Sequence, residues 1–244
     1  MVSRKNKILL LQIREQHDPM LLQERKAFAQ ALGKELETIS SLDLLYEQLT
    51  SDHLAEVDLV MIGGSGNYSV TSNEEWLFRA LDSIRFLFES EKPTFASCWG
   101  FQAVARALGG EVITDLGQAE VGSLATFLTP DGKTDRLFGE CPDQFFSYLG
   151  HQDIVTRLPE NAVLLASTEK VENQAITFPG RMFYATQFHP ELSRSDLMER
   201  VDAYPQYVEK ISGLPVHEFE KTIVDAPEMA GLLQRFVQLV EQAG

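Results

Sequence analysis

The sequence predicts an α/β fold: a single three-layer domain with a mainly parallel central sheet, an antiparallel edge layer and a C-terminal helical extension. Three observations support this prediction. Short apolar runs alternate with helical patterns in the first half of the chain, which is typical of a parallel sheet covered by helices. Strand-like runs with few helices between them fill the second half. From residue 195 onward the pattern is helical again.

The first half carries the alternating elements. An apolar run near the N-terminus predicts a buried strand, and the helical spacing after it stops at Gly33, a residue favoured at helix C-termini. A second strong strand pattern, VDLVMI, is closed by a glycine-rich turn. In chain order we expect a strand over 7–13, a helix over 21–32, a weaker strand over 35–40, a strand over 57–62, a helix over 73–90, a strand over 93–97 and a helix over 99–108.

The second half predicts strands over 111–115, 120–129, 163–168, 174–178 and 182–188. The helical tail is interrupted at Pro205, Pro215 and Pro227, because proline disrupts a helix interior. We therefore expect an α/β domain over residues 1–194 and a helical C-terminal extension packed on it over 195–244. The acidic composition of the extension predicts a solvated face, and a partner-docking surface is the alternative.

Composition excludes several classes of protein. The chain has 244 residues, and 21 Lys and Arg against 36 Asp and Glu leave a net charge of −15. Such an acidic chain is a poor match for nucleic acid or an anionic membrane surface. No run approaches the length of a membrane-spanning helix. The two cysteines form no disulfide framework, so we expect a reducing, cytoplasmic location.

Cys98 lies between a predicted strand and a predicted helix, in the segment ASCWGFQ over residues 96–102. This arrangement is the thiol form of a nucleophile elbow. The tight turn directs the side chain over the carboxyl end of the sheet, and the helix N-terminus favours the thiolate and supplies N–H donors for an oxyanion. Gly100 permits the close backbone approach that the turn needs. The alternative is a buried structural cysteine.

A thiol nucleophile needs a base, and the segment HPE over residues 189–191 directly follows a predicted strand. Positions two apart on an extended chain face the same side, so His189 and Glu191 can project together. We therefore predict a catalytic triad of Cys98, His189 and Glu191, in which His189 takes the thiol proton and Glu191 holds the imidazole tautomer. The structural alternative is that His189 and Glu191 are surface residues at the capped end of a strand.

The glycine-rich turn GGSG over residues 63–66 predicts an oxyanion hole formed by the N–H groups of Gly64 and Trp99. A simple tight turn is the structural alternative. No Lys-Ser or Lys-Thr pair follows, so the turn is not a phosphate-binding loop. No acidic cluster or Cys/His spacing indicates a metal. We predict no metal site and no cofactor.

Together these motifs resemble the class I glutamine amidotransferases, which carry a glycine-rich turn, then G-x-C-x-G-x-Q, then a strand ending in H-P-E. The chain has all three in that order, within about residues 7–193. EVG over residues 120–122 is similar to the family's E-x-G strand start, and GHQD over 150–153 to its S-H-x-D loop. The chain looks most like the glutaminase portion of GMP synthases, standing alone with an added helical tail.

The resemblance implies a flavodoxin-like class I amidotransferase fold over the α/β domain, and glutaminase chemistry. In the family, the cysteine attacks the γ-carboxamide of glutamine, the histidine protonates the departing ammonia, and water hydrolyses the γ-glutamyl thioester. The resemblance further implies that Gln102 holds the glutamyl part of the substrate, and that Gly150 and Gln152 line its amino-acid end. The ammonia would pass to a separate synthase subunit, because the sequence carries no ATP-binding fingerprint.

The chain departs from the family pattern at three positions: Ala96 replaces the first glycine of the elbow, Ser65 the usual proline, and Gly150 the usual serine. Ala96 is small enough to be tolerated, whereas the other two alter loops around the site. Three functions therefore stay open. The first is an amidotransferase that feeds ammonia to a partner, the second a γ-glutamyl peptide or amide hydrolase without a synthase, and the third a catalytically silent binding module.

Overall fold

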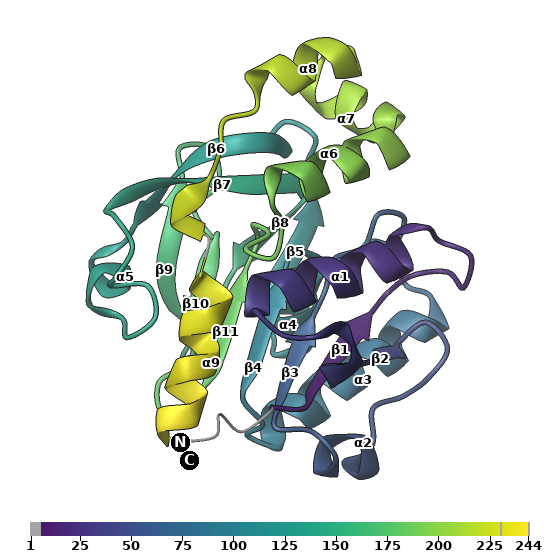
Figure 1. Cartoon of the computed structure of the whole chain (residues 1–244), viewed down its shortest axis with the longest axis vertical. Coiled ribbons are helices and arrows are strands. Elements are labelled where there is room, and N and C mark those ends of the chain that lie inside the picture. Colours follow the sequence, from purple (N-terminus) through teal and green to yellow (C-terminus); the bar gives the residue numbers. More distant parts are fainter. Residues whose placement is uncertain (1–5, 230, 244) are drawn as a thin grey trace.

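One long β-sheet runs through the computed structural model, which describes residues 6–229 and 231–243 (Figure 1). The strands are β1 Ile8–Gln12, β2 Ile39–Asp43, β3 Leu59–Ile62, β4 Thr94–Ser97, β5 Glu111–Thr114, β6 Glu120–Leu128, β7 Gln144–His151, β8 Asp153–Arg157, β9 Val163–Thr168, β10 Ala175–Thr177 and β11 Phe183–Thr186. In the described part of the chain, nine of them join in the order β2-β1-β3-β4-β11-β10-β9-β6-β7, while β5 and β8 pair separately. Neighbours from β2 to β11 are parallel, and those from β11 to β7 are antiparallel.

Helices α1 and α9 cover one face of the parallel half, and α3 and α4 cover the other. The helices of the described part of the chain are α1 Met20–Leu32, α2 Ser51–Ala55, α3 Glu75–Glu89, α4 Trp99–Ala107, α5 Pro130–Thr134, α6 Arg194–Ala203, α7 Pro205–Ser212, α8 Val216–Thr222 and α9 Leu232–Ala243. Side chains alternate along β1: Leu9 and Leu11 join the core beneath α3 and α4, whereas Ile8 and Leu10 join the core beneath α1 and α9. The three-layer α/β prediction is confirmed.

Most predicted elements of the first half are present within two residues of their expected ends. The helix α1 stops as predicted at Gly33, whose φ of 63° lies in the left-handed region that glycine favours. The strand expected over 35–40 is wrong in its first part, where a 3-10 turn at Leu36–Thr38 precedes β2. The Thr38 hydroxyl donates to the Glu35 carbonyl at 2.6 Å, and such a local bond competes with strand pairing.

The sequence patterns missed β7 and β8, which matter because they carry Gly150 and flank Gln152. β7 pairs with β6 along its length, and β8 pairs with β5 outside the main sheet. In β7 exposed and buried residues alternate over 144–147, but Ser147, Tyr148 and Leu149 are buried in succession, so the period-2 signal of a strand is interrupted there.

The C-terminal helices pack on the rest of the chain in two places. Figure 1 shows α6, α7 and α8 grouped beyond β6 and β7, and Val201, Val208 and Phe219 form a third core there. The chain then returns to the α1 face, where the ring of Phe236 on α9 lies 5.6 Å from that of Phe95. The predicted breaks are present, since α7 begins at Pro205 and α8 just after Pro215. A domain boundary at residue 194 stays a prediction.

None of the described helices has the length and apolar character needed to cross a bilayer.

Candidate functional site

Cys98 occupies the junction between β4 and α4, at the carboxyl end of the parallel strands. Its φ of 52° and ψ of −106° are unusual for a side chain with a Cβ, and its N–H donates to the Thr186 carbonyl at 2.7 Å. The Gly100 N–H donates to the Gly63 carbonyl at 3.1 Å, and a Cβ at Gly100 would lie 2.8 Å from the Ile62 side chain. The elbow therefore needs glycine two positions after the cysteine.

His189 follows β11, the neighbour of β4 in the sheet, and its Nδ1 lies 2.7 Å from Glu191 Oε1. A Cβ built at Gly64 would lie 3.1 Å from His189 Cε1 and 3.7 Å from Cys98 Cβ, so the imidazole and the cysteine flank the same turn. Burial opposes the charged imidazolium, but the Glu191 carboxylate and the Cys98 side chain outweigh it and raise the pKa of His189 to about 9. The structure thus brings the three predicted residues together.

The two predicted oxyanion donors differ in their surroundings. Trp99 is the first residue of α4, where a backbone N–H has no acceptor within the helix. The Gly64 N–H instead donates to the buried Glu24 carboxylate at 3.0 Å. Gly64 can therefore serve as an oxyanion donor only if this hydrogen bond is exchanged.

The predicted substrate-binding residues lie around a polar pocket on one side of Cys98. Gln102, Gly150 and Gln152 all line it, together with Ser69, Asp153 and other residues. Gln102 is held in place because its Nε2 donates to the Asp153 carbonyl at 2.9 Å and to Gln187 Oε1 at 3.1 Å. The Gly150 carbonyl lies 3.8 Å from the Cys98 Sγ.

A second, apolar pocket opens on the other side of Cys98. His189 and Tyr207 line it with six aliphatic side chains, Val121, Leu149, Leu192, Leu197, Val201 and Val208. Several of these residues belong to α6 and α7, so the C-terminal extension forms part of the wall. The sequence patterns gave no indication of this pocket.

Sequence reasoning also missed Glu24 on α1. Its side chain is fully buried, yet it accepts hydrogen bonds from Arg14 Nε, Gln12 Nε2 and the Gly64 N–H, each at 3.0 Å. Burial favours the neutral acid, but Arg14 and Arg200 outweigh it and lower the pKa of Glu24. One signal was available, because Glu24 precedes Ala27 and Phe28 by three and four positions on the apolar face of the helix.

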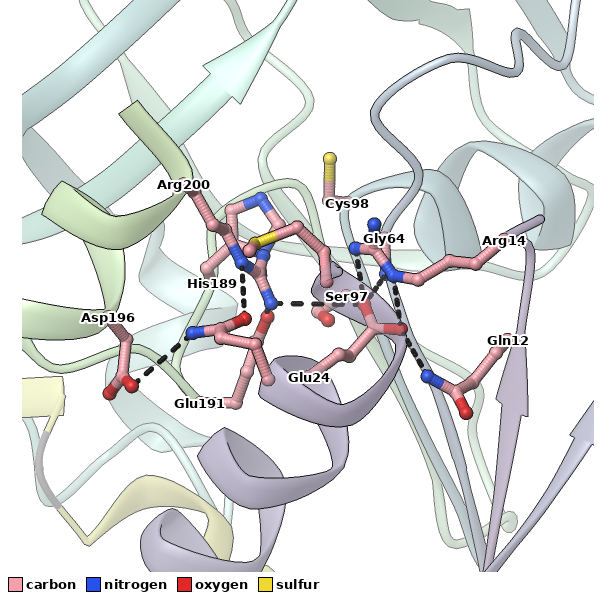
Figure 2. A network of polar contacts seen from close by, with 12 residues as sticks. Gln12, Arg14, Glu24, Gly64, Ser97, Cys98, His189, Glu191, Asp196 and Arg200 are labelled. Atoms are coloured by element: carbon pink, nitrogen blue, oxygen red, sulfur yellow. Dashed lines mark hydrogen bonds and ion pairs between the residues drawn. The ribbon is translucent and has the colours of Figure 1, made fainter. Parts of the chain in front are cut away.

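Arg200 on α6 was missed as well, and it connects the two halves of the network in Figure 2. Its Nη1 lies 3.5 Å from Glu191 Oε1, and its Nη2 lies 3.8 Å from Glu24 Oε1. The C-terminal extension thereby places the Arg200 guanidinium between two carboxylates: Glu191, which contacts His189, and Glu24, which accepts the hydrogen bond from Gly64. Nothing near Arg200 in the sequence marks it for this position.

Residues 27–201 match the family model "Glutamine amidotransferase class-I". The chain is 30% identical over 179 residues to gamma-glutamyl peptidase 3 of Arabidopsis thaliana, covering 72% of this chain and 71% of that protein. It is 28% identical over 158 residues to one subunit of the glutamine-hydrolyzing GMP synthase of Archaeoglobus fulgidus, covering 65% of this chain and 78% of that protein.

The chain also matches much longer proteins. It is 33% identical over 132 residues to the glutamine-hydrolyzing GMP synthase of Leifsonia xyli subsp. xyli, and this match covers 53% of this chain but only 25% of the synthase. Among solved structures, a glutamine amidotransferase from Thermotoga maritima superposes with a TM-score of 0.74 at 23% identity, over 96% of this chain and 98% of that one. The structural likeness supports the fold.

Proposed function

The chain belongs to the class I glutamine amidotransferase family, and from this premise we propose that it cleaves γ-glutamyl amide bonds through a thioester on Cys98. Glutamine is the first candidate substrate. The observation that carries the proposal is the buried contact of 2.7 Å between His189 Nδ1 and Glu191 Oε1. Cys98 lies beside the same imidazole, at the end of the neighbouring strand β4. This is the arrangement that activates a thiol nucleophile.

The proposed reaction has two steps. The Cys98 thiolate attacks the γ-carbonyl, a C–S bond forms, the C–N bond breaks, and protonated His189 gives its proton to the departing nitrogen. Water then attacks the thioester with His189 as base, which releases glutamate and restores the thiol. The N–H groups of Trp99 and, after leaving Glu24, of Gly64 stabilise the oxyanion. Gln102, Gly150 and Gln152 hold the glutamyl part.

We propose that ammonia released from glutamine serves a separate synthase partner in the cytoplasm. One observation supports a separate partner. The chain matches a GMP synthase subunit of Archaeoglobus fulgidus over 78% of that protein's length.

Glutamate release from glutamine by the purified chain tests the proposal. We expect Cys98→Ala to lower kcat at least about a thousandfold, because it removes the nucleophile. Cys141→Ala is the matched control, since it removes the other cysteine and should retain activity. A glutamine-like electrophile should form an adduct on Cys98. If no glutamate is released with or without candidate synthases, and no adduct forms, the proposal is wrong.

A second candidate, hydrolysis of γ-glutamyl peptides or amides without a synthase, is favoured by one structural observation. The helices α6 and α7 stand over the His189 side of Cys98 and line the pocket there. The likeness to gamma-glutamyl peptidase 3 agrees with this candidate. Values of kcat/KM for glutamine and a panel of γ-glutamyl compounds separate the two candidates. Retention of all three triad residue types argues against a catalytically silent binding module.

A further inference from the structure

Two pockets meet at Cys98, and their linings differ in character. The polar pocket presents Gln102, Gln152 and Asp153, whereas the apolar pocket presents six aliphatic side chains of valine and leucine. Five residues border both pockets: Ser65, Gly66, Cys98, Gly150 and Tyr207. A substrate attacked by Cys98 therefore has room on both sides of the scissile bond.

The position of His189 decides which part of a substrate enters which pocket. In the proposed reaction His189 protonates the leaving nitrogen, so that nitrogen must lie beside the imidazole. His189 lines the apolar pocket and is not among the residues of the polar pocket. The leaving amine thus faces the apolar pocket, and the glutamyl part faces Gln102.

Two guanidinium groups, those of Arg14 and Arg200, also line the apolar pocket, and among the described residues both face carboxylates of the protein. Arg14 lies 3.0 Å from Glu24 and 3.1 Å from Asp18, and Arg200 lies between Glu191 and Glu24. The guanidinium groups are thus matched by buried carboxylates, and the rest of the lining is mostly apolar, with six aliphatic side chains. Transfer of an apolar group from water to such a surface is favourable, whereas burying a charged group there is costly.

We propose that the apolar pocket binds the amine part of γ-glutamyl amides whose amine carries an aliphatic or aromatic group. This inference rests on the proposed cleavage of γ-glutamyl amides and specifies its leaving group. Cys98 forms a C–S bond to the γ-carbonyl, the C–N bond breaks, and the apolar amine departs with a proton from His189. Water then hydrolyses the thioester to glutamate.

The test is a substrate series with the purified full chain: glutamine, γ-glutamyl methylamide, γ-glutamyl isobutylamide, γ-glutamyl benzylamide and γ-glutamylglycine. Glutamate release is measured against a Cys98→Ala blank. We expect kcat/KM to rise with the apolar size of the amine, by about tenfold or more from glutamine to the isobutylamide, which is the range for burying a few methyl or methylene groups. We expect γ-glutamylglycine, with its carboxylate, to be poorer than the isobutylamide.

A pair of variants assigns the preference to the pocket. Val121 lies on β6 and lines the apolar pocket, and Ala125 lies on the same strand outside it. Val121→Phe fills part of the pocket and should lower the isobutylamide-to-glutamine ratio of kcat/KM about tenfold. Ala125→Leu adds bulk to the same strand and should leave the ratio unchanged.

The outcomes separate the inference from the proposed function. Hydrolysis with glutamine or γ-glutamylglycine as the best substrate overturns the apolar pocket assignment and leaves the thioester chemistry intact. If no compound is hydrolysed, the proposed function fails. Calorimetry with the Cys98→Ala protein then tests the pocket by itself. Binding of the isobutylamide no tighter than that of glutamine would overturn the assignment there as well.

Discussion

At the scale of single residues, Glu24 connects more of the site than any residue the motifs identify. It is a fully buried carboxylate that contacts Arg14, Gln12 and the Gly64 N–H, with Arg200 nearby. A buried charge of this kind is tolerated because its partners compensate for lost hydration. Its loss would leave Arg14 buried with Asp18 as its one remaining ionic partner in the part of the chain that the structure describes.

Glu24→Gln keeps the shape of the side chain and removes its charge. We expect the free energy of unfolding to fall by about 3–5 kcal/mol, the usual result of breaking a buried ion pair from one side. Urea unfolding monitored by circular dichroism measures it. The exposed Glu37→Gln is the control and should change stability by less than about 0.5 kcal/mol. A loss below about 1 kcal/mol for Glu24→Gln would mean that Arg14 does not depend on this carboxylate.

At the scale of elements, the junction of β4 and α4 and the turn after β3 form one unit. The Gly100 N–H donates to the Gly63 carbonyl, and the Ile62 side chain fills the space where a Cβ on residue 100 would lie. Contacts with β4, with β11 and with the glycine-rich turn thus keep the strained backbone of Cys98 in place. Such support is what keeps an unfavourable backbone conformation in place.

Gly100→Ala tests this unit. The added methyl group would lie 2.8 Å from Ile62 Cγ2 and 3.0 Å from the Ile62 carbonyl oxygen, so the elbow must shift. We expect a loss of about 1–3 kcal/mol in unfolding free energy, which is typical of overpacking, together with reduced labelling of Cys98 by a glutamine-like electrophile. Gly117→Ala, in an exposed turn, should alter neither measurement. Wild-type labelling and stability in Gly100→Ala would contradict the proposed support.

At the scale of the whole molecule, the C-terminal segment completes the structure in two ways. The helices α6 and α7 line the apolar pocket and bring Arg200 to the site. The helix α9 covers the α1 face of the sheet, where Phe236 packs against Phe95 and Tyr184 with no exposed surface. This packing predicts that the segment from residue 195 onward unfolds together with the sheet.

Phe236→Ala measures that dependence. Removal of a fully buried phenylalanine should cost about 3–5 kcal/mol, because both the transfer energy and the cavity contribute. Thermal unfolding should remain a single transition at a lower temperature. Phe78→Ala, at a phenylalanine that is 47% exposed, should cost much less. A separate early transition in the wild type would show instead that α9 unfolds independently.

Stability should also depend on pH through His189. Its pKa is about 9 in the folded chain and about 6.5 in an unfolded one, so the folded state binds the proton more tightly. Protonation of His189 therefore contributes up to about 3 kcal/mol to the free energy of unfolding. This contribution is complete below about pH 6.5 and is lost as the pH rises through 9. Urea unfolding at pH 6 and pH 9.5 measures this loss. In His189→Gln, the free energies of unfolding at pH 6 and pH 9.5 should differ less than they do in the wild type. If they differ as much as in the wild type, His189 is not the source of the pH dependence.

The sequence indicated the fold class and the predicted triad because their signals are local. A glycine two residues after Cys98, a strand before it and the HPE segment after another strand each specify geometry within a few positions. The strand before His189 was expected in the antiparallel edge layer, and this was wrong, because β11 lies parallel to β4 in the middle of the sheet. The chemistry of the two motifs predicted that Cys98 and His189 lie together, and the carboxyl ends of these neighbouring strands bring them there. β7 escaped prediction because the alternation of exposed and buried residues breaks at residues 147–149.

The sequence by itself therefore determined the α/β architecture, the family, and which side chains stand at the ends of β4 and β11. Only the tertiary structure decided that the Gly64 N–H faces Glu24, that Arg200 lies between two buried carboxylates, and that α6 and α7 form an apolar wall beside His189. The physical reason is the distance along the sequence over which each kind of interaction acts. Helix and strand patterns and turn residues act over a few positions, whereas ion-pair partners and pocket walls depend on how helices far apart in the chain pack.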